Sequence, residues 1–374
     1  MQLQLTLEQA YARASEGLRQ KMEYSVRLLQ KAERLALAYD RRGGYFLAFS
    51  GGKDSQALLH IAQLAGVQYT GHMNLTSVDP PEVIRFVKQN YPEVELTKPK
   101  ASIYRVAVEK SLLPTQRVRW CCNEYKENAG AGKVTLIGIR HQESTRRSKR
   151  NEVEISSYKF SGTLEGFEQY REERLKQPKR GRPPKGVNIT NATSERTIGC
   201  ISGKESLLIS PIIHWTASDV WEFLNKVCQV PHCSLYDEGY SRIGCICCPM
   251  SSQRQKIKEM KRWPHVKRNW IKAIIDIRRG GVSQRTLTRE NPVVRYWERL
   301  APHYPPHPKR EGGYIQAPDP KWWLGFSDSS SSVGLTEEQE QQIAENIFDW
   351  WISGKSYKKW YAEKFLQLKL EFNV

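Results

Sequence analysis

Residues 45–55 read Tyr-Phe-Leu-Ala-Phe-Ser-Gly-Gly-Lys-Asp-Ser. The first five residues of this stretch form an aromatic-rich apolar run that is typical of a buried strand, and residues 54–65 carry apolar side chains at helical spacing. The first N–H groups of such a helix have no partner within it, and Gly51 and Gly52 let the backbone curl closely around an anion. The turn also offers the hydroxyls and the amine of Ser50, Ser55 and Lys53. The stretch therefore predicts a strand, a phosphate-binding loop and a helix.

The loop resembles a known nucleotide-binding motif. The string Ser-Gly-Gly-Lys-Asp-Ser lacks the Gly-x-x-x-x-Gly-Lys-Ser/Thr spacing of a Walker A loop. It is similar to the PP-loop of the N-type ATP pyrophosphatases and of their relatives, the phosphoadenosine phosphosulfate (PAPS) reductase family. In that superfamily the loop holds the pyrophosphate end of ATP, which is split into AMP and pyrophosphate to activate a substrate. The resemblance implies that ATP and Mg²⁺ bind here, with Lys53 stabilising phosphate charge and Asp54 helping to hold the metal. It implies nucleotide contacts by Ser50, Gly51, Gly52, Lys53, Asp54 and Ser55.

Strand-like and helix-like segments alternate through the first half of the chain. After residues 45–49, strands are expected at 67–72, 94–97, 134–138 and 207–209, with helices between them. This alternation predicts an α/β fold with a parallel sheet and helices on both faces. Ligands bind beyond the carboxyl ends of such strands. Three stretches are therefore expected to meet at one site, namely residues 50–55, 74–79 and 138–147.

The last of these stretches is rich in arginine. Residues 138–147 read Gly-Ile-Arg-His-Gln-Glu-Ser-Thr-Arg-Arg, and arginine is a bidentate donor to phosphate or sulfate oxygens. Charge alone would also fit a solvated basic loop. The pattern Gly-x-Arg-x-x-Glu-Ser-x-x-Arg, however, resembles a nucleotide-site motif of the PAPS reductase family. The resemblance implies nucleotide contacts by Gly138, Arg140, Glu143, Ser144 and Arg147, with a catalytic role for Arg140.

Two clusters of cysteines need a chemical explanation. Cys121 and Cys122 are adjacent, and Cys245-Ile-Cys-Cys has the Cys-x-x-Cys spacing shared by zinc sites and iron–sulfur clusters. Cys-Cys followed by Gly-Cys-x-x-Cys, after a Leu-Tyr-Asp-Glu-Gly-Tyr segment, resembles the iron–sulfur members of the PAPS reductase family. The resemblance implies a 4Fe-4S cluster held by Cys121, Cys122, Cys245 and Cys248. A zinc site with four cysteine ligands is the alternative, and Cys233 or Cys247 could replace one of the four.

Charge points to a polyanionic partner. The chain has 58 Lys and Arg against 40 Asp and Glu, a formal net charge of +18. Within the polar residues 150–206, the segment Pro-Lys-Arg-Gly-Arg-Pro-Pro-Lys at 178–185 resembles the core of an AT-hook, which lies in the narrow minor groove of A·T-rich DNA. A flexible basic loop fits this short motif equally well. The segment predicts contacts to DNA, rather than RNA, by Lys179, Arg180, Arg182 and Lys185.

A second basic stretch, residues 252–270, contains Trp263 and Trp270. Basic residues interleaved with aromatic ones can hold a nucleic-acid backbone and stack bases. The same pattern also fits helices that turn their tryptophans inward and their lysines outward. The sequence leaves both interpretations open.

We expect three regions in the chain: an N-terminal helical segment at 1–40, a PP-loop domain at 41–265 with a basic insertion at about 150–206, and a helical C-terminal region at 266–374 with a Pro-, Gly- and Ser-rich linker. No run reaches the ~18 to 20 apolar residues of a membrane span, and no signal peptide is recognisable. A cytoplasmic location without membrane contact is therefore expected. In that reducing compartment, the eight cysteines favour metal ligands or thiols over disulfides.

These features together predict an ATP pyrophosphatase and sulfurtransferase of the PAPS reductase family. It would adenylylate an acceptor for iron–sulfur-dependent sulfur transfer, with DNA as the favoured acceptor, as in backbone phosphorothioation. A sulfur donor such as a cysteine desulfurase, and partner subunits, are expected. The alternatives are a PAPS or adenylylsulfate reductase, a transfer RNA thiolase, and a non-catalytic nucleotide-sensing DNA-binding subunit with a structural zinc site. The reductase is disfavoured because those enzymes use a nucleophilic cysteine near the C-terminus, whereas all cysteines here lie at or before Cys248.

Overall fold

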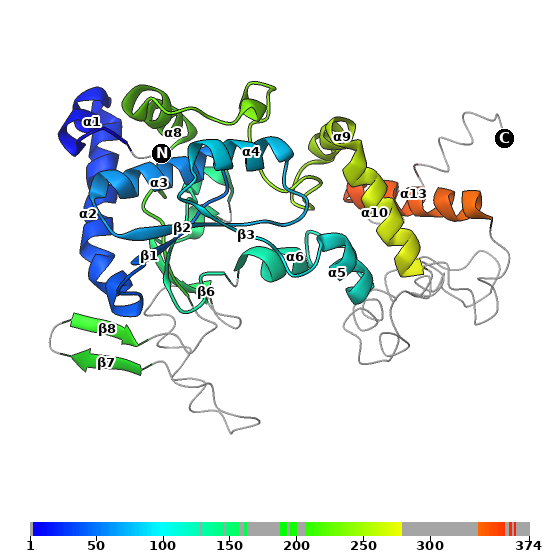
Figure 1. Cartoon of the computed structure of the whole chain (residues 1–374), viewed down its shortest axis with the longest axis horizontal. Coiled ribbons are helices and arrows are strands. Elements are labelled where there is room, and N and C mark those ends of the chain that lie inside the picture. Colours follow the sequence, from blue (N-terminus) through cyan, green and yellow to red (C-terminus); the bar gives the residue numbers. More distant parts are fainter. Residues whose placement is uncertain are drawn as a thin grey trace. The chain divides into compact units, whose positions relative to one another are not determined.

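The chain forms two compact units, seen in the computed structural model (Figure 1). The structure describes residues 3–127, 129–145, 147–156, 161–162, 188–192, 195–199, 206–278, 336–355, 359–360 and 363. The first unit consists of Met1–Leu75, Asp79–Lys98 and Cys122–Gly244, and the second of Thr76–Val78, Pro99–Cys121 and Cys245–Val374. The chain therefore passes from one unit to the other several times.

A seven-stranded sheet with the order β3-β2-β1-β4-β9-β5-β6 lies at the centre of the first unit. The strands are β1 (Tyr45–Ala48), β2 (Tyr69–Asn74), β3 (Glu95–Thr97), β4 (Val134–Leu136), β9 (Ser206–Ile209), β5 (Val153–Ser156) and β6 (Ser161–Gly162). The first five of these are parallel, β5 is antiparallel to β9, and β6 is antiparallel to β5. The predicted α/β fold with a parallel sheet is confirmed.

The order of the strands reverses at β1. From β1 the chain moves outward through β2 to β3, and it then returns to add β4 on the other side of β1, followed by β9. The loops after β1 and β4 therefore leave neighbouring parallel strands in opposite directions. In open α/β sheets such a switch point opens a crevice in which ligands bind.

The first unit also contains helices, and the one predicted at residues 54–65 begins one residue earlier, at Lys53. The helices are α1 (Leu7–Arg13), α2 (Glu16–Tyr39), α3 (Lys53–Ala65), α4 (Pro81–Asn90) and α8 (Ala217–Glu222), and α8 continues as a π-helix at Phe223–Cys228. Thr6 and Gln9 form a capping box before α1, and Gly66 ends α3 with a φ of +69°. Short helical turns lie at Trp120–Cys122, Asn123–Glu127, His141–Glu143, Arg147–Lys149 and Ser234–Tyr236.

The expected polar insertion contains structure that the sequence did not reveal. β5 and β6 extend the main sheet, and β7 (Asn188–Ala192) pairs antiparallel with β8 (Glu195–Gly199) in a separate sheet. β5 is only four residues long and has two apolar positions, too few for a recognisable alternation, yet Ile155 is fully buried. The AT-hook-like segment at 178–185 lies outside the described residues.

The second unit is helical. It contains α5 (Ile103–Lys110), α9 (Gln253–Arg262), α10 (Pro264–Arg278) and α13 (Glu337–Ser353), and α10 packs against the other three. The Trp270 ring lies at the centre of the packing, 4.9 Å from the ring of Tyr104 and 4.8 Å from that of Trp351. The indole N–H of Trp351 donates to the carbonyl of Pro114 at 2.7 Å. Among the described residues, no helix is long and apolar enough to cross a membrane.

A buried hydroxyl joins α2 to the chain after β9 in the first unit. Ser25 is fully buried; its Oγ donates to the carbonyl of Pro211 at 2.7 Å and accepts the indole N–H of Trp215 at 3.1 Å. Ser25→Ala leaves both partners buried and unsatisfied, so the free energy of unfolding should fall by ~1–3 kcal/mol in denaturant titration. Ser148→Ala, at an exposed hydroxyl, serves as the control. Equal stability of the two variants would contradict the prediction.

Candidate active site

The switch point brings the two predicted phosphate-binding stretches together. The loop at residues 50–55 follows β1, and the stretch that begins at Gly138 follows β4, the parallel neighbour of β1. A Cβ added to Gly138 would lie 2.9 Å from the carbonyl oxygen of Asp54, a distance that side chains do not tolerate. Gly138 therefore lets the chain after β4 approach the first turn of α3. The contact between these two stretches is confirmed. Of the third expected stretch, 74–79, Thr76–Val78 belong instead to the second unit, where Thr76 and Val78 accept hydrogen bonds from Cys245 and Ile246.

Asp54 is shared by two cations. Its Oδ2 accepts from Lys53 Nζ at 2.8 Å, and its Oδ1 accepts from Arg140 Nε at 2.6 Å. The side chains of Lys53 and Arg140 are only 8% and 5% exposed, whereas that of Asp54 is 20% exposed. Two nearly buried cations thus share one carboxylate and leave an excess positive charge at the start of α3. An excess charge with little access to water attracts an anion strongly.

The backbone of the loop adds donors to this charge. Gly51 has a φ of +69°, and a Cβ there would lie 2.8 Å from the side chains of both Val83 and Val87 on α4. Only glycine therefore fits the close turn that precedes α3. Gly52 is the N-cap of the helix, so the helix dipole and the first N–H groups face the loop.

The two serines of the loop are hydrogen-bonded to each other. Ser50 Oγ and Ser55 Oγ are 3.2 Å apart, and Ser55 Oγ also donates to the carbonyl of Gly52 at 2.8 Å. These bonds hold the loop in its curled form. All six residues of the predicted PP-loop thus lie in one tight turn at the N-terminus of α3.

Tyr236 is a site residue that the sequence analysis did not single out. Its Oη accepts the backbone N–H of Lys53 at 2.8 Å, and burial raises its pKa, so the hydroxyl keeps its proton. A Cβ on Gly52 would lie 3.5 Å from both Tyr236 Oη and Ser50 Oγ, so both oxygens border the same space. The ring is supported by Trp221, 4.9 Å away. The Leu-Tyr-Asp-Glu-Gly-Tyr segment was the available signal, but nothing in it indicated a contact with the loop.

The remaining predicted nucleotide contacts lie in the loop after β4. Glu143 accepts the backbone N–H of Arg140 at 3.0 Å and forms an ion pair with Arg147. Ser144 Oγ accepts the backbone N–H of Arg147 at 3.2 Å. Gln142, which the sequence analysis passed over, accepts from Arg140 Nη1 at 3.2 Å. In the structure these residues orient the loop and the guanidinium of Arg140, and direct nucleotide contacts by Glu143, Ser144 and Arg147 stay a prediction.

The described residues do not assemble the predicted cysteine site. They contain no group of three or more His, Cys, Asp or Glu side chains that could hold a metal ion, whereas a 4Fe-4S cluster needs four thiolates. Cys245 Sγ donates to Thr76 Oγ1 at 3.4 Å, and Cys247 is buried with a φ of +60°. Burial also raises the pKa of the thiols of Cys233 and Cys247. The cysteines as placed do not fit a cluster.

One family model matches the part of the chain that contains this site. The family model of the phosphoadenosine phosphosulfate reductase domain matches residues 44–251, which span both the loop and the stretch after β4. An adenosine 5'-phosphosulfate reductase of Oceanobacillus iheyensis is 39% identical over 59 residues, which cover 16% of this chain and 24% of that protein. A crystal structure of Candida glabrata FMN adenylyltransferase with FMN and an ATP analog has a TM-score of 0.37 and 12% identity, covering 64% of this chain and 72% of that chain.

A longer match is to an uncharacterized protein of Methanocaldococcus jannaschii, 24% identical over 226 residues. These residues cover 60% of this chain and 46% of that protein, so the chain spans about half the length of this curated relative. The family model, in contrast, covers more than half of the chain itself and includes every residue that shapes the phosphate-binding turn. The chain therefore belongs to the phosphoadenosine phosphosulfate reductase family.

Proposed function

We propose that the protein is an ATP pyrophosphatase that adenylylates an acceptor and prepares it for sulfur transfer. The observation that carries this proposal is the pair of nearly buried cations, Lys53 and Arg140, sharing the single carboxylate of Asp54 at the N-terminus of α3. A phosphate chain would neutralise the excess charge there and accept hydrogen bonds from the loop. An adenine nucleotide that lies with its phosphates on residues 50–55 fits these donors.

The reaction would break the bond between the α- and β-phosphates of ATP. A nucleophilic oxygen of the acceptor attacks the α-phosphorus, and pyrophosphate leaves with the electron pair of the broken bond. Lys53 and Arg140 stabilise the charge that develops on the phosphates, and the Tyr236 hydroxyl can donate to an oxygen above Gly52. A nucleophile at the oxidation level of sulfide then displaces AMP and leaves sulfur on the acceptor. If a cysteine desulfurase supplies the sulfur as a persulfide, a thiol reductant must provide two electrons.

The acceptor we favour is DNA, because the chain has a net charge of +18 and an AT-hook-like segment. In this case a non-bridging phosphate oxygen of the DNA would be the nucleophile. The alternative is an adenylylsulfate or PAPS reductase, which the short match to the Oceanobacillus iheyensis reductase supports. Incubation with ATP and DNA separates the two: an adenylylating enzyme releases pyrophosphate, whereas a reductase releases sulfite from adenylylsulfate or PAPS when thioredoxin is present.

A metal ion would assist at the phosphates. Mg²⁺ is usually held by one or two carboxylates together with substrate phosphates, so the partly exposed carboxylate of Asp54 fits this role without a larger ligand cluster. When bound, the ion neutralises phosphate charge. No step is assigned to an iron–sulfur cluster, whose proposed ligands stay Cys121, Cys122, Cys245 and Cys248.

Arg140→Ala should lower the rate of pyrophosphate release by ~10²- to 10³-fold, because one preorganised charge is removed from the phosphate site. Asp54 keeps its bond to Lys53 in this variant, so the fold should survive. The measurement is a coupled pyrophosphate assay with ATP and DNA, and the control is Arg19→Ala at an exposed arginine of α2. A rate equal to that of the wild-type protein would exclude Arg140 from the site.

Gly51→Ala should abolish tight ATP binding, whereas Gly66→Ala should not. Both glycines have a φ of +69°, so alanine costs a similar backbone strain of ~1–2 kcal/mol at either position. A methyl group at 66 meets nothing within 4 Å, but at 51 it lies 2.8 Å from Val83 and Val87. Calorimetric titration with a non-hydrolysable ATP analogue isolates the role of the loop. Equal affinities would show that the phosphates bind elsewhere.

The cluster is tested by metal analysis of anaerobically purified protein. About four irons per chain, with a broad visible absorption band that Cys245→Ala removes, would establish the cluster and show that the cysteines rearrange around it. Because metal binding couples to local folding, such rearrangement is physically reasonable. One zinc per chain and no colour would instead establish the zinc alternative.

A further inference from the structure

The exposed faces of α9 and α10 carry almost only positive charge. The sequence from Gln253 to Arg278 has nine Lys and Arg and two Asp and Glu. One of the two acids, Glu259, is buried and accepts the backbone N–H of Cys247 at 2.6 Å; the other, Asp276, is half-buried. The exposed cations, which we name the basic stripe, are Arg254, Lys258, Lys261, Arg262, Arg268 and Lys272.

The basic stripe follows helical geometry. On α9 its members recur every three or four residues, and on α10 Arg268 and Lys272 are four apart, so on each helix they share one face. The opposite face of α10 is apolar and buried, from Val266 to Ile277. Each helix thus presents a row of cations outward along its length.

Charge is segregated within the second unit. α13 packs against α9 and α10 but has no Lys or Arg between Glu337 and Ser353, where it has five Asp and Glu. The long helix α2 of the other unit mixes five Lys and Arg with three Glu. Solubility alone does not require that positively and negatively charged side chains lie on different helices. Separation produces a local field that a polyanion can follow.

The burial of the two tryptophans distinguishes between single-stranded and double-stranded nucleic acid as the partner. Trp263 and Trp270 are 4% and 1% exposed, so neither ring can stack on a base. Proteins that bind single strands commonly stack the bases on exposed aromatic rings, whereas a duplex keeps its bases stacked inside and presents its phosphate backbone outward. The structure therefore favours the inward-tryptophan interpretation, and with it a duplex backbone as the partner of the outward cations.

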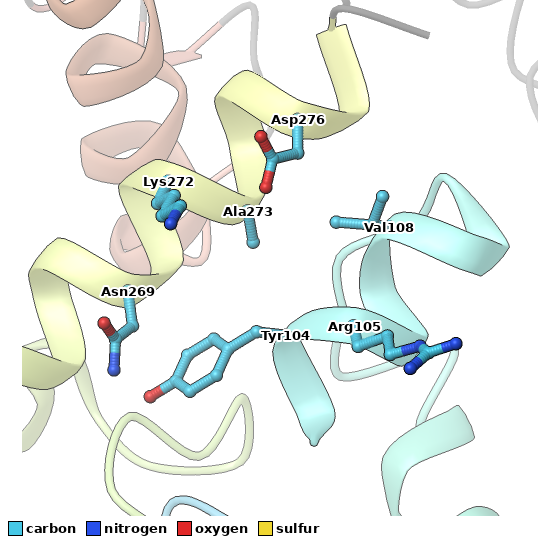
Figure 2. A pocket seen from close by; sticks show the side chains of 7 residues that line it. All are labelled: Tyr104, Arg105, Val108, Asn269, Lys272, Ala273 and Asp276. Carbon is cyan, nitrogen blue, oxygen red and sulfur yellow. The ribbon is translucent and has the colours of Figure 1, made fainter. Parts of the chain in front are cut away.

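A pocket of about 390 Å³ lies between α10 and α5, beside the basic stripe. Figure 2 shows Lys272 and Asp276 of α10 on one side and Arg105 and Val108 of α5 on the other, with the ring of Tyr104 directed toward Asn269. The ring of Tyr104 also packs against the ring of Trp270. Arg105 adds one exposed cation at the edge of this recess, where it pairs with Glu109 at 2.9 Å, and Asp276 adds an acid, so the phosphate contacts are assigned to the stripe and not to the recess.

We propose that the basic stripe is a docking surface for the phosphate backbone of double-stranded nucleic acid. This surface is separate from the AT-hook-like segment at 178–185. The proposal rests on the proposed function only in the choice of DNA as the first ligand to test.

The test measures binding of the full-length chain to a fluorescently labelled DNA duplex over a series of salt concentrations. A fourfold variant, with Arg254, Lys261, Arg268 and Lys272 each changed to Gln, removes part of the stripe without touching a buried residue. The matched control changes Arg19, Arg27, Lys31 and Arg41 to Gln, which removes the same charge from exposed positions of the first unit. Thermal unfolding of both variants checks that they are folded.

A plot of log Kobs against log salt has a negative slope, and each phosphate contact contributes about 0.9 to its magnitude. The magnitude of the slope should therefore be smaller by about 3 to 4 in the stripe variant and nearly unchanged in the control. Equal slopes in the two variants, or no duplex binding by the wild-type chain, would overturn the proposal. A duplex RNA probe shows whether the surface distinguishes DNA from RNA. ATP-dependent pyrophosphate release by the wild-type chain in the presence of DNA is recorded in parallel, and its absence despite duplex binding would count against the proposed function and not against the stripe. If the fourfold variant unfolds, the pairs Arg254→Gln with Lys261→Gln and Arg268→Gln with Lys272→Gln should each lower the magnitude of the slope by about half as much.

Discussion

The carboxylate of Asp54 is the point on which the site depends, because it holds two cations that would otherwise repel each other in a poorly hydrated place. Lys53 and Arg140 come from loops that are far apart in sequence, and each lies within hydrogen-bond distance of a different oxygen of Asp54. Leaving a buried charge unpaired is costly, so the unliganded protein needs this carboxylate. The same arrangement keeps a positive excess, which makes the site ready for a polyanion.

The ion pair between Asp54 and Arg140 can form because the sheet topology places their loops side by side. A reversal of strand order at β1 makes the loop after β1 and the loop after β4 neighbours, and Gly138 removes the side chain that would separate them. Tyr236 then supplies from a third segment the hydrogen-bond acceptor that the Lys53 N–H lacks within its helix. The site is therefore assembled from three segments that are distant in the sequence.

The sequence was most informative where local chemistry decides the structure. The apolar run at 45–49 and the glycines of the loop each favour one local conformation, and the parallel sheet followed from the alternation of strand-like and helix-like segments. Less could be predicted where long-range packing decides. β5 is too short to have a pattern, and the bond from Lys53 to Tyr236 joins residues that no spacing rule connects. The cysteines are a third case, because their geometry can depend on a bound metal that the sequence does not specify.

We assign two roles to cations in this chain: binding of a nucleotide by buried cations and binding of nucleic acid by exposed ones. Lys53 and Arg140 are nearly inaccessible to water, so these two charges are enough to attract a single phosphate chain strongly. The cations of the basic stripe are exposed and screened by salt, so each contributes little by itself. A surface of this kind becomes effective only when many such charges repeat along an extended polyanion, where the release of counterions adds with each contact. This difference explains why a compact nucleotide site can be built from a few residues, whereas a nucleic-acid surface needs whole helices.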